Sequence, residues 1–283
     1  MKYAILAYVA WGFFPIFWKL LGGLPAIEIL CHRVVYSTIF YSALLVYFGH
    51  SVLIREPIRN WYRMALSSFL LFVNWFAFIY AVNTDQVIEA SLGYFINPLI
   101  NVAMGVLILR ERLSVPRWIA LFLACAGVVW LSLQSSGPPY LALFLAVTFG
   151  LYGYIRKVTP IDSVRGGQME AIWMIPFVLL ATSQSEVHLH FPNYTVLEWC
   201  LLALSGAVTG MPLVWFAEAA QIVPLNLLGF IQYISPTLQF LMGWLVFGEP
   251  FHIDRMIGFG FIWAALMVFA YDMLRKREIS TIA

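Results

Sequence analysis

Charged residues are scarce in this sequence of 283 residues. Asp, Glu, Lys and Arg together make up 11% of the chain, whereas 62% is hydrophobic and the mean hydropathy is +0.86. Soluble domains carry about twice as much charge, so this composition excludes a soluble globular protein. The net charge is only +2, and no basic cluster is interleaved with aromatic residues, so we expect no nucleic-acid partner.

Cysteine is scarce too, and the local signatures of enzymes are missing. The three cysteines, Cys31, Cys125 and Cys200, lie in apolar runs, where we expect buried free thiols. The chain has no HExxH, no GxSxG, no phosphate-binding loop and no paired acidic metal motif. We therefore predict no enzymatic activity, no cofactor and no metal, and no ATP-driven pumping by this chain alone.

Long apolar segments are what the sequence has in abundance. Each is near the ~20 residues that a helix needs to cross a bilayer, and short loops with Gly, Pro, Asn or Ser separate them. The sequence therefore predicts an all-α integral membrane protein with about ten transmembrane helices, embedded in a lipid bilayer. The predicted spans are 3–21, 28–48, 63–82, 88–109, 117–134, 140–156, 167–184, 196–217, 225–247 and 256–274.

Basic residues recur in alternate loops of the first two thirds of the chain, which orients it, although the loop near 218–224 has none and Arg255 falls on the other side. Arg55, Arg59 and Arg63 fall in one such loop, Arg110 and Arg112 two loops later, and further basic residues two loops after that. Lys and Arg concentrate in the cytoplasmic loops of membrane proteins, so both termini are expected in the cytoplasm.

Two segments far apart in the sequence share one pattern. Tyr94, Asn97 and Asn101 lie around Pro98, and 138 residues later Gln232, Ser235 and Gln239 lie around Pro236. Glu111 returns as Glu249 at the same offset. We read this as two similar halves, residues 1–137 and 138–283. With five spans in each, the second half must enter the membrane upside down, as in the inverted repeats of secondary transporters.

The polar residues of these segments could line a cavity or join helices by hydrogen bonds. Residues spaced by three and four share one helix face, and a proline inside that face is expected to break the helix at Pro98 and at Pro236. Discontinuous helices are where transporters hold substrate, although amides also link membrane helices. The predicted substrate-binding residues are Tyr94, Asn97, Asn101, Gln232, Tyr233 and Gln239, with aromatic walls from Trp11 and Trp75.

Ionisable residues within the spans form a second candidate set. Lys19 ends the first span, while Glu28, His32 and Arg33 open the second, and Lys157 and Glu170 occupy the repeat positions of Lys19 and His32. These groups are predicted to act in gating or in coupling, with protons as the candidate ion. The alternative is an interfacial ion cluster with snorkelling side chains. Gly206 and Gly210 form a GxxxG that predicts a helix contact.

Several of these motifs together resemble a known family. They include the run from Glu89 to Leu99 followed by Glu111-Arg112, the Trp11-Gly12 pair with Lys19, and the Glu28, His32, Arg33 cluster. They also include Asn74-Trp75, Glu170 with Trp173 and Pro176, Gln232-Tyr233 and Pro236-Thr237. The chain is similar to the RarD branch of the EamA transporters, in the drug/metabolite transporter superfamily. This resemblance covers essentially the whole chain and implies a ten-helix carrier of the bacterial inner membrane. It also adds Asn74 to the candidate substrate site, while Glu218 departs from the small residue expected there.

The leading hypothesis is a secondary transporter that exports small amphipathic organic solutes, metabolites or drugs, by alternating access. A second hypothesis is an integral-membrane enzyme acting on lipid-linked substrates, which could also use Glu28, His32 and Glu170. A third is a packing partner of another membrane protein. The sequence does not name the small-molecule substrate, the coupling ion, the direction of net flux or the oligomeric state.

Overall fold

The computed structural model describes residues 1–83, 87–134, 140–183, 194–247 and 253–282, and every regular element among them is an α-helix. Eleven helices follow one another along the described chain. They are α1 (Lys2–Lys19), α2 (Ala26–Tyr47), α3 (Ile58–Asn83), α4 (Val87–Leu107), α5 (Val115–Leu133), α6 (Tyr140–Val158), α7 (Ser163–Ser183), α8 (Val196–Ile222), α9 (Leu225–Gln232), α10 (Ile234–Leu245) and α11 (Ile253–Ile282).

These helices fall on the ten predicted segments, with the ninth segment divided into α9 and α10. Five of them are long and apolar enough to cross a bilayer, and α4 contributes a shorter apolar stretch, Leu92–Leu107. The five are Ile27–Tyr47 in α2, Val115–Leu133 (α5), Tyr140–Val158 (α6), Val196–Ile222 (α8) and Met256–Arg275 in α11. The prediction of an all-α membrane protein is therefore confirmed in its class.

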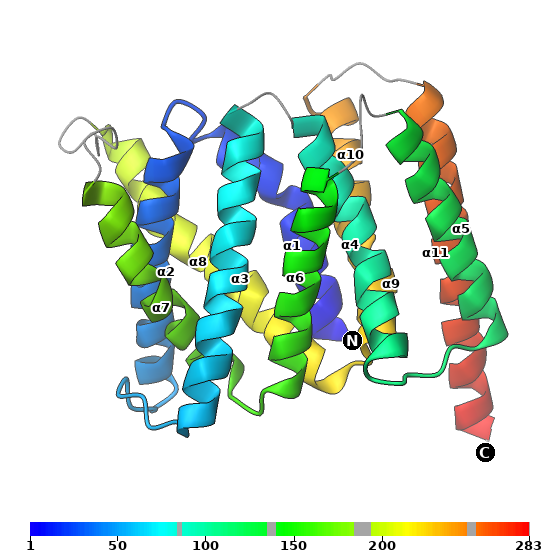
Figure 1. Ribbon diagram of the computed structural model, residues 1–283, viewed down its shortest axis with the longest axis horizontal. Coiled ribbons are helices and arrows are strands. Elements are labelled where there is room, and N and C mark those ends of the chain that lie inside the picture. The colour runs from blue at the N-terminus through cyan, green and yellow to red at the C-terminus, as the bar shows by residue number, and fades with distance from the viewer. Residues whose placement is uncertain (84–86, 135–139, 184–193, 248–252, 283) are drawn as a thin grey trace.

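The helices stand side by side in an elongated bundle (Figure 1). The helices α5 and α11 pack together at one end, and α2 packs with α7 at the other. Between them, α4 packs against both α6 and α9, and α3 lies against α6 and α7. The helix α8 crosses the bundle obliquely and contacts α1, α2 and α6.

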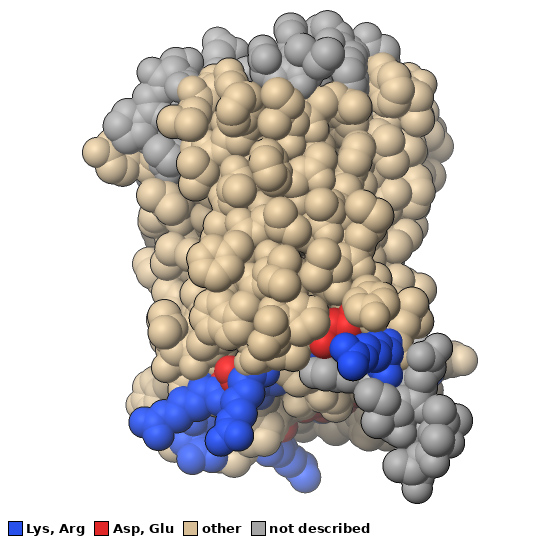
Figure 2. Space-filling view, turned by 90° about the vertical axis from the view of Figure 1, so that its right-hand side faces the viewer, with Lys and Arg blue, Asp and Glu red and all other residues tan. Residues whose placement is uncertain are grey.

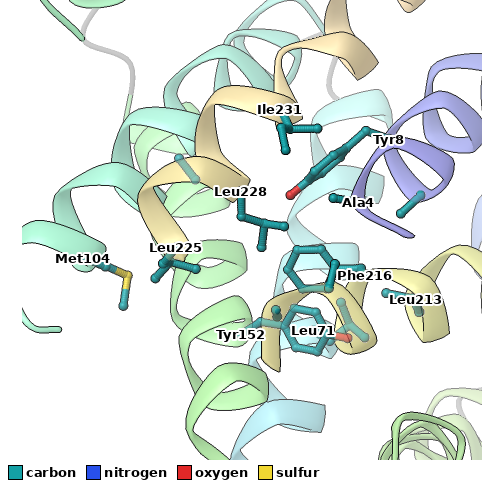
Figure 3. Packing of buried hydrophobic residues seen from close by; sticks show 14 of the residues in the cluster. Ala4, Tyr8, Leu71, Met104, Tyr152, Leu213, Phe216, Leu225, Leu228 and Ile231 are labelled. Carbon is teal, nitrogen blue, oxygen red and sulfur yellow. The ribbon is translucent and has the colours of Figure 1, made fainter. Parts of the chain in front are cut away.

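Aromatic side chains fill the centre of the bundle (Figure 3). Tyr8 of α1 and Tyr152 of α6 both pack against Phe216 of α8, with ring centroids 6.2 and 5.7 Å apart. Leu228 of α9 lies against the same group and is fully buried, as are all three aromatic residues. Because these rings come from α1, α6 and α8, one cluster joins the two halves of the chain.

Close approach of α2 and α8 depends on two glycines. A Cβ at Gly206 would overlap the backbone C and O of Tyr36 and lie 2.7 Å from the amide N of Ser37, and a Cβ at Gly210 would lie 2.6 Å from the Phe40 ring. The predicted GxxxG contact is confirmed, because only a hydrogen at these positions permits backbone-to-backbone packing.

The two prolines behave differently from the expectation that each breaks its helix. The helix α4 continues through Pro98, so the break predicted there is wrong. Membrane helices tolerate proline because neighbouring helices and small local adjustments satisfy the freed carbonyl. In the ninth segment the chain breaks at Tyr233, and Pro236 lies in the first turn of α10, where a missing N–H costs no hydrogen bond.

The three cysteines are free, as predicted, but they are not all buried. Cys31 is buried, Cys125 is half-buried and Cys200 is exposed. The prediction of burial is wrong for Cys200, because an apolar run in a membrane helix has one side toward the bundle and another toward lipid.

On one face of the molecule, charged side chains gather at one end (Figure 2). On the face shown in Figure 2, all the coloured Lys, Arg, Asp and Glu residues lie at the lower end of the described surface. Both ends of the chain lie on this same side (Figure 1). We call it the basic end, and the side of the α2 N-terminus the opposite end.

The glycine contact generates a prediction about stability. Gly206→Ala should destabilise the protein by about 1–3 kcal/mol, because a methyl group forced into a full contact must push α2 and α8 apart. Thermal unfolding of the purified protein in detergent measures the effect. Gly260→Ala is the matched control, since Gly260 is also inside a helix and a Cβ added there would meet nothing within 4 Å. Equal melting temperatures for the two variants would contradict the proposed packing role.

Candidate functional site

A narrow cavity lies between α2, α3, α7 and α8. Its polar and aromatic lining comes from Ser37 and Tyr41 of α2, Trp75 of α3 and Glu170 of α7, with Leu213 of α8 on an apolar side. Its volume of about 20 Å³ holds about one water molecule. Organic ligands need cavities of a few hundred Å³, so a solute could enter only if these helices move apart.

Glu170 is held in a buried ion pair at the wall of this cavity. Its carboxylate lies 3.6 Å from the Arg156 guanidinium and accepts a hydrogen bond of 2.5 Å from the Ser67 hydroxyl. Ser68 donates to the backbone carbonyl of Glu170 at 2.8 Å, which fixes α3 against α7. Glu170 and Arg156 are only 3% and 1% exposed, so removing either partner would leave a buried uncompensated charge.

Arg33 lies on the same face of α2 as Ser37 and Tyr41, at the start of the stripe they form. Its guanidinium carbon is 3.8 Å from the centroid of the Trp75 ring and 5.2 Å from that of Trp18. The hydroxyls of Tyr94 and Tyr41 lie within electrostatic reach of this charge. Trp75, from the predicted substrate set, therefore contacts Arg33, from the predicted gating set.

The amides of the two polar stripes meet elsewhere, where α4, α6 and α9 pack together. Gln232 donates to the Asn97 carbonyl oxygen, and Asn101 donates to the Gln232 carbonyl oxygen at 2.6 Å. Asn97 donates to the backbone oxygen of Ala146 at 2.7 Å. Asn97, Asn101 and Gln232 are buried. The structure thus brings three predicted residues together, in a network whose donors are bonded within the protein.

Among the remaining predicted substrate residues, Asn74 and Gln239 also bond to the protein, whereas the buried hydroxyl of Tyr233 has no hydrogen-bond partner among the described residues. Asn74 donates to the Leu145 carbonyl at 2.8 Å and to the Thr148 hydroxyl at 2.9 Å. Gln239 donates to the backbone oxygen of Trp11 at 3.0 Å. The Trp11 ring belongs to the central aromatic cluster with Phe149 and Phe216, and Tyr233 is 1% exposed. In contrast, Tyr94 is 41% exposed.

The predicted cluster at the opposite end divides into separate groups. Glu28 accepts a hydrogen bond of 2.7 Å from the Tyr194 hydroxyl, which also lies 3.3 Å from the His32 ring nitrogen Nε2. Lys19 lies instead over the Phe247 ring, 4.0 Å from its centroid. Arg33 lies over the ring of Trp75, a residue of the cavity wall, and near that of Trp18.

At the basic end, two predicted residues close the junction between α8 and α9. Lys157 donates to the carbonyls of Ala220 and Val223 at the end of α8, at 3.1 and 2.7 Å. Glu111 accepts from the first backbone amides of α9, Leu225 and Asn226, at 2.7 and 2.8 Å. Each charge thus complements the helix end beside it. The repeat partner of Glu111, Glu249, lies outside the described residues.

Sequence reasoning missed three residues of the cavity region: Ser37, Tyr41 and Arg156. Arg33, Ser37 and Tyr41 are spaced by four, a polar stripe that could have been found on α2. The sequence pattern points to Lys157 and not to its neighbour Arg156. In the structure Lys157 bonds to α8, and Arg156 pairs with Glu170. Glu218, whose role was open, accepts a hydrogen bond of 2.7 Å from Ser163.

Comparisons with known proteins agree with one another. The model of the EamA-like transporter family matches residues 1–133. Protein RarD of Escherichia coli is 38% identical over 96% of this chain and 93% of its own length, and Protein RarD of Streptomyces exfoliatus is 40% identical over 99% and 90%. The chain belongs to the RarD-type EamA transporters. It is therefore a multi-pass membrane transporter of a bacterial family.

Other relatives of this RarD-type chain are also named as transporters. An uncharacterized transporter of Pseudomonas aeruginosa is 40% identical over 96% of this chain and 93% of its own length. One solved protein, known by crystal structure, superposes with a TM-score of 0.74 over 94% of this chain and 95% of that chain, at 18% identity. That last likeness establishes the fold alone.

The amide network generates a prediction that separates helix contact from substrate contact. Asn97→Leu should destabilise the protein by about 1–3 kcal/mol, because it leaves the Gln232 and Asn101 donors buried without one acceptor. Gln239→Leu, which breaks one bond to a backbone oxygen, should cost about 0.6 kcal/mol. Melting temperature and the half-saturation concentration of transport are to be measured on the same samples. A large loss of affinity at an unchanged melting temperature would instead place Asn97 in the substrate site.

Proposed function

We propose that this RarD-type protein is a secondary transporter that exports small amphipathic organic solutes by alternating access. The observation that carries the proposal is the cavity between α2, α3, α7 and α8, which is lined by Glu170 and Ser37 and by the aromatic residues Trp75 and Tyr41. Arg33 lies beside this cavity, over the ring of Trp75. Ionisable side chains at membrane depth are costly unless they serve a pathway or a binding site. Proton coupling through Glu170 belongs to the same proposal.

The helix contacts support an arrangement of ten spans in two inverted repeats, residues 1–137 and 138–283. Exchanging each helix of the first half for its counterpart in the second turns the α4–α6 contact into the α1–α10 contact, and both exist. The same exchange relates α3–α6 to α1–α8, and α2–α8 to α3–α7. In addition, the family match ends at Leu133, the last residue of α5, so one half resembles one family unit.

The residues at the α8–α9 junction support a conformation closed at the basic end. Lys157 and Glu111 tie α6 and the segment after α4 to the ends of α8 and α9. Opening on that side must break these bonds, whereas Tyr94, nearer the opposite end of α4, stays 41% exposed. An alternating carrier needs such a difference between its two sides.

The alternative of a membrane enzyme needs Glu28, His32 and Glu170 to act together. Glu28 and His32 share the hydroxyl of Tyr194 near the start of α2, while Glu170 pairs with Arg156 on the other side of the cavity. These groups lie in two clusters with separate partners. The arrangement therefore favours the transporter.

The proposed orientation generates a topological prediction. In a chain whose three native cysteines are replaced by alanine, Gly23→Cys should react with an impermeant maleimide added to intact cells, and Arg112→Cys only after permeabilisation. Gly23 has open space around it and Arg112 is exposed, so both thiols are reachable. Labelling of both from the same side would contradict the proposed orientation.

The transport function has a direct test that needs no prior substrate. Purified protein in liposomes is incubated with a whole bacterial metabolite extract, with and without a pH gradient, and the retained solutes are identified by mass spectrometry. We expect organic solutes to accumulate above the level in protein-free liposomes. Glu170→Gln should remove the response to the pH gradient if this carboxylate carries the proton. Retention equal to that of empty liposomes would contradict transport.

A further inference from the structure

Arg33 carries a half-buried charge that no carboxylate among the described residues neutralises. Its Nε atom is buried without a hydrogen-bond partner, and its guanidinium forms no ion pair with any residue in the described ranges. The residue lies seven positions after the start of α2, about 10 Å below that helix end. A guanidinium at such a depth is stable only with compensating groups, and those present are the faces of Trp75 and Trp18.

The one carboxylate on the cavity wall is already engaged. Glu170 pairs with Arg156 at 3.6 Å and accepts a bond from Ser67. Glu170 is the charged residue of the cavity lining, and Arg156 already neutralises it. Arg33, which lies over the lining residue Trp75, is therefore a positive charge beside the cavity that has no ionic partner among the described residues. An arriving anion would be attracted to this site, whereas an arriving cation would be repelled from it.

From this charge and its surroundings, we propose that Arg33 binds the carboxylate of the transported solute, and that the solute is an organic acid with an apolar or aromatic body. The proposal rests on the transport function proposed above and narrows its substrate class. A guanidinium whose face lies on a tryptophan keeps its N–H edge available, and that edge matches the two oxygens of a carboxylate.

A second unsatisfied group lies one helical turn further along α2. The Ser37 hydroxyl lines the cavity, and the residue is 5% exposed with no hydrogen-bond partner among the described residues. Because Arg33 and Ser37 are spaced by four, they share one face of the helix. A solute that places its carboxylate on Arg33 could accept a further hydrogen bond from Ser37 as it moves into the cavity.

The rest of the cavity wall sets the apolar requirement. Trp75, Leu71, Met174 and Leu213 line it with aromatic and aliphatic surface. The body of the solute would contact these side chains when the helices move apart. A small hydrophilic acid would leave this surface without a partner, so the pairing of one carboxylate with an apolar body fits the site best.

Three probes of nearly equal shape test the charge preference. They are 3-phenylpropionate, its neutral amide and the cation 3-phenylpropylamine, each titrated into the purified full-length protein in nanodiscs by isothermal calorimetry. Uptake of each probe into proteoliposomes is measured in parallel. We expect the carboxylate to bind and to be transported, with affinity at least about tenfold above that for the amide and the amine.

Variants then assign the effect to Arg33. Arg33→Gln should weaken carboxylate binding by about tenfold or more, Arg33→Lys should retain part of it, and Ser37→Ala should cost less than Arg33→Gln. Arg59→Gln is the matched control, since it removes an exposed arginine outside the cavity and should leave affinity unchanged. Melting temperatures show which variants are folded. The charge-retaining variant Arg33→Lys keeps the test valid if Arg33→Gln unfolds.

Each outcome bears on one of the two proposals. Binding and uptake of the amine or the amide in preference to the carboxylate would overturn the carboxylate site and leave the transport function standing. Failure of the carboxylate to bind, or equal binding by wild type and the folded Arg33 variants, would also overturn it. Carboxylate binding that depends on Arg33 but brings no uptake would support the site and contradict transport.

Discussion

The cost of leaving a polar group unsatisfied in an apolar medium is the constraint on which this structure depends. A buried carboxylate or guanidinium is tolerated only when paired and hydrogen-bonded. Glu170 and Arg156 meet this condition together, and Ser67 and Ser68 reinforce it from α3. These contacts fix α3, α6 and α7 relative to one another, so the requirement for charge pairing also positions the cavity wall. Arg33 is half-buried and has no ionic partner among the described residues, which is why we propose it as part of a binding site.

Close packing of the helices also holds the bundle together. Lipid gives helices no hydrophobic reason to associate, so close van der Waals contact must hold them together. Gly206 lets α8 touch the backbone of α2, and Gly229 of α9 lies close to the backbone oxygen of Pro98 on α4. The stacked rings of Tyr152 and Phe216 then join the halves at the centre (Figure 3). Helix pairs packed this closely can move little relative to each other. Any large rearrangement is therefore expected between helix pairs that pack less closely.

Sequence alone predicted the helical class and nearly all helix positions, because apolar length and turn residues are local properties. It also named Arg33, Glu170 and Trp75, which the structure brings to the region of one cavity. The sequence could not predict which groups these side chains bond to. The amide of Asn97 can line a cavity or bond to another helix, and only the packing of α4 on α6 and α9 shows that its donor reaches Ala146. Arg156 and Lys157 are adjacent in sequence, but neighbouring residues point to different sides of a helix. Arg156 therefore pairs with Glu170, while Lys157 bonds to the end of α8. Proline was misleading for the same reason, since the neighbours of Pro98 determine whether its helix continues.

The two corresponding segments differ in one respect. The ninth segment is broken at Tyr233 into α9 and α10, whereas α4 is one continuous helix. Two halves that were identical in structure would give a carrier whose two facing states had equal free energy. Here one half has a helix break that the other lacks, so in the proposed alternating-access cycle the two states would differ in free energy. A ratio of 10 between their populations needs only about 1.4 kcal/mol. With such a difference the unliganded carrier would rest mainly in one orientation, and its apparent affinity for solute would differ between the two faces of the membrane. A transporter built in this way would be kinetically asymmetric even without an ion gradient to drive it.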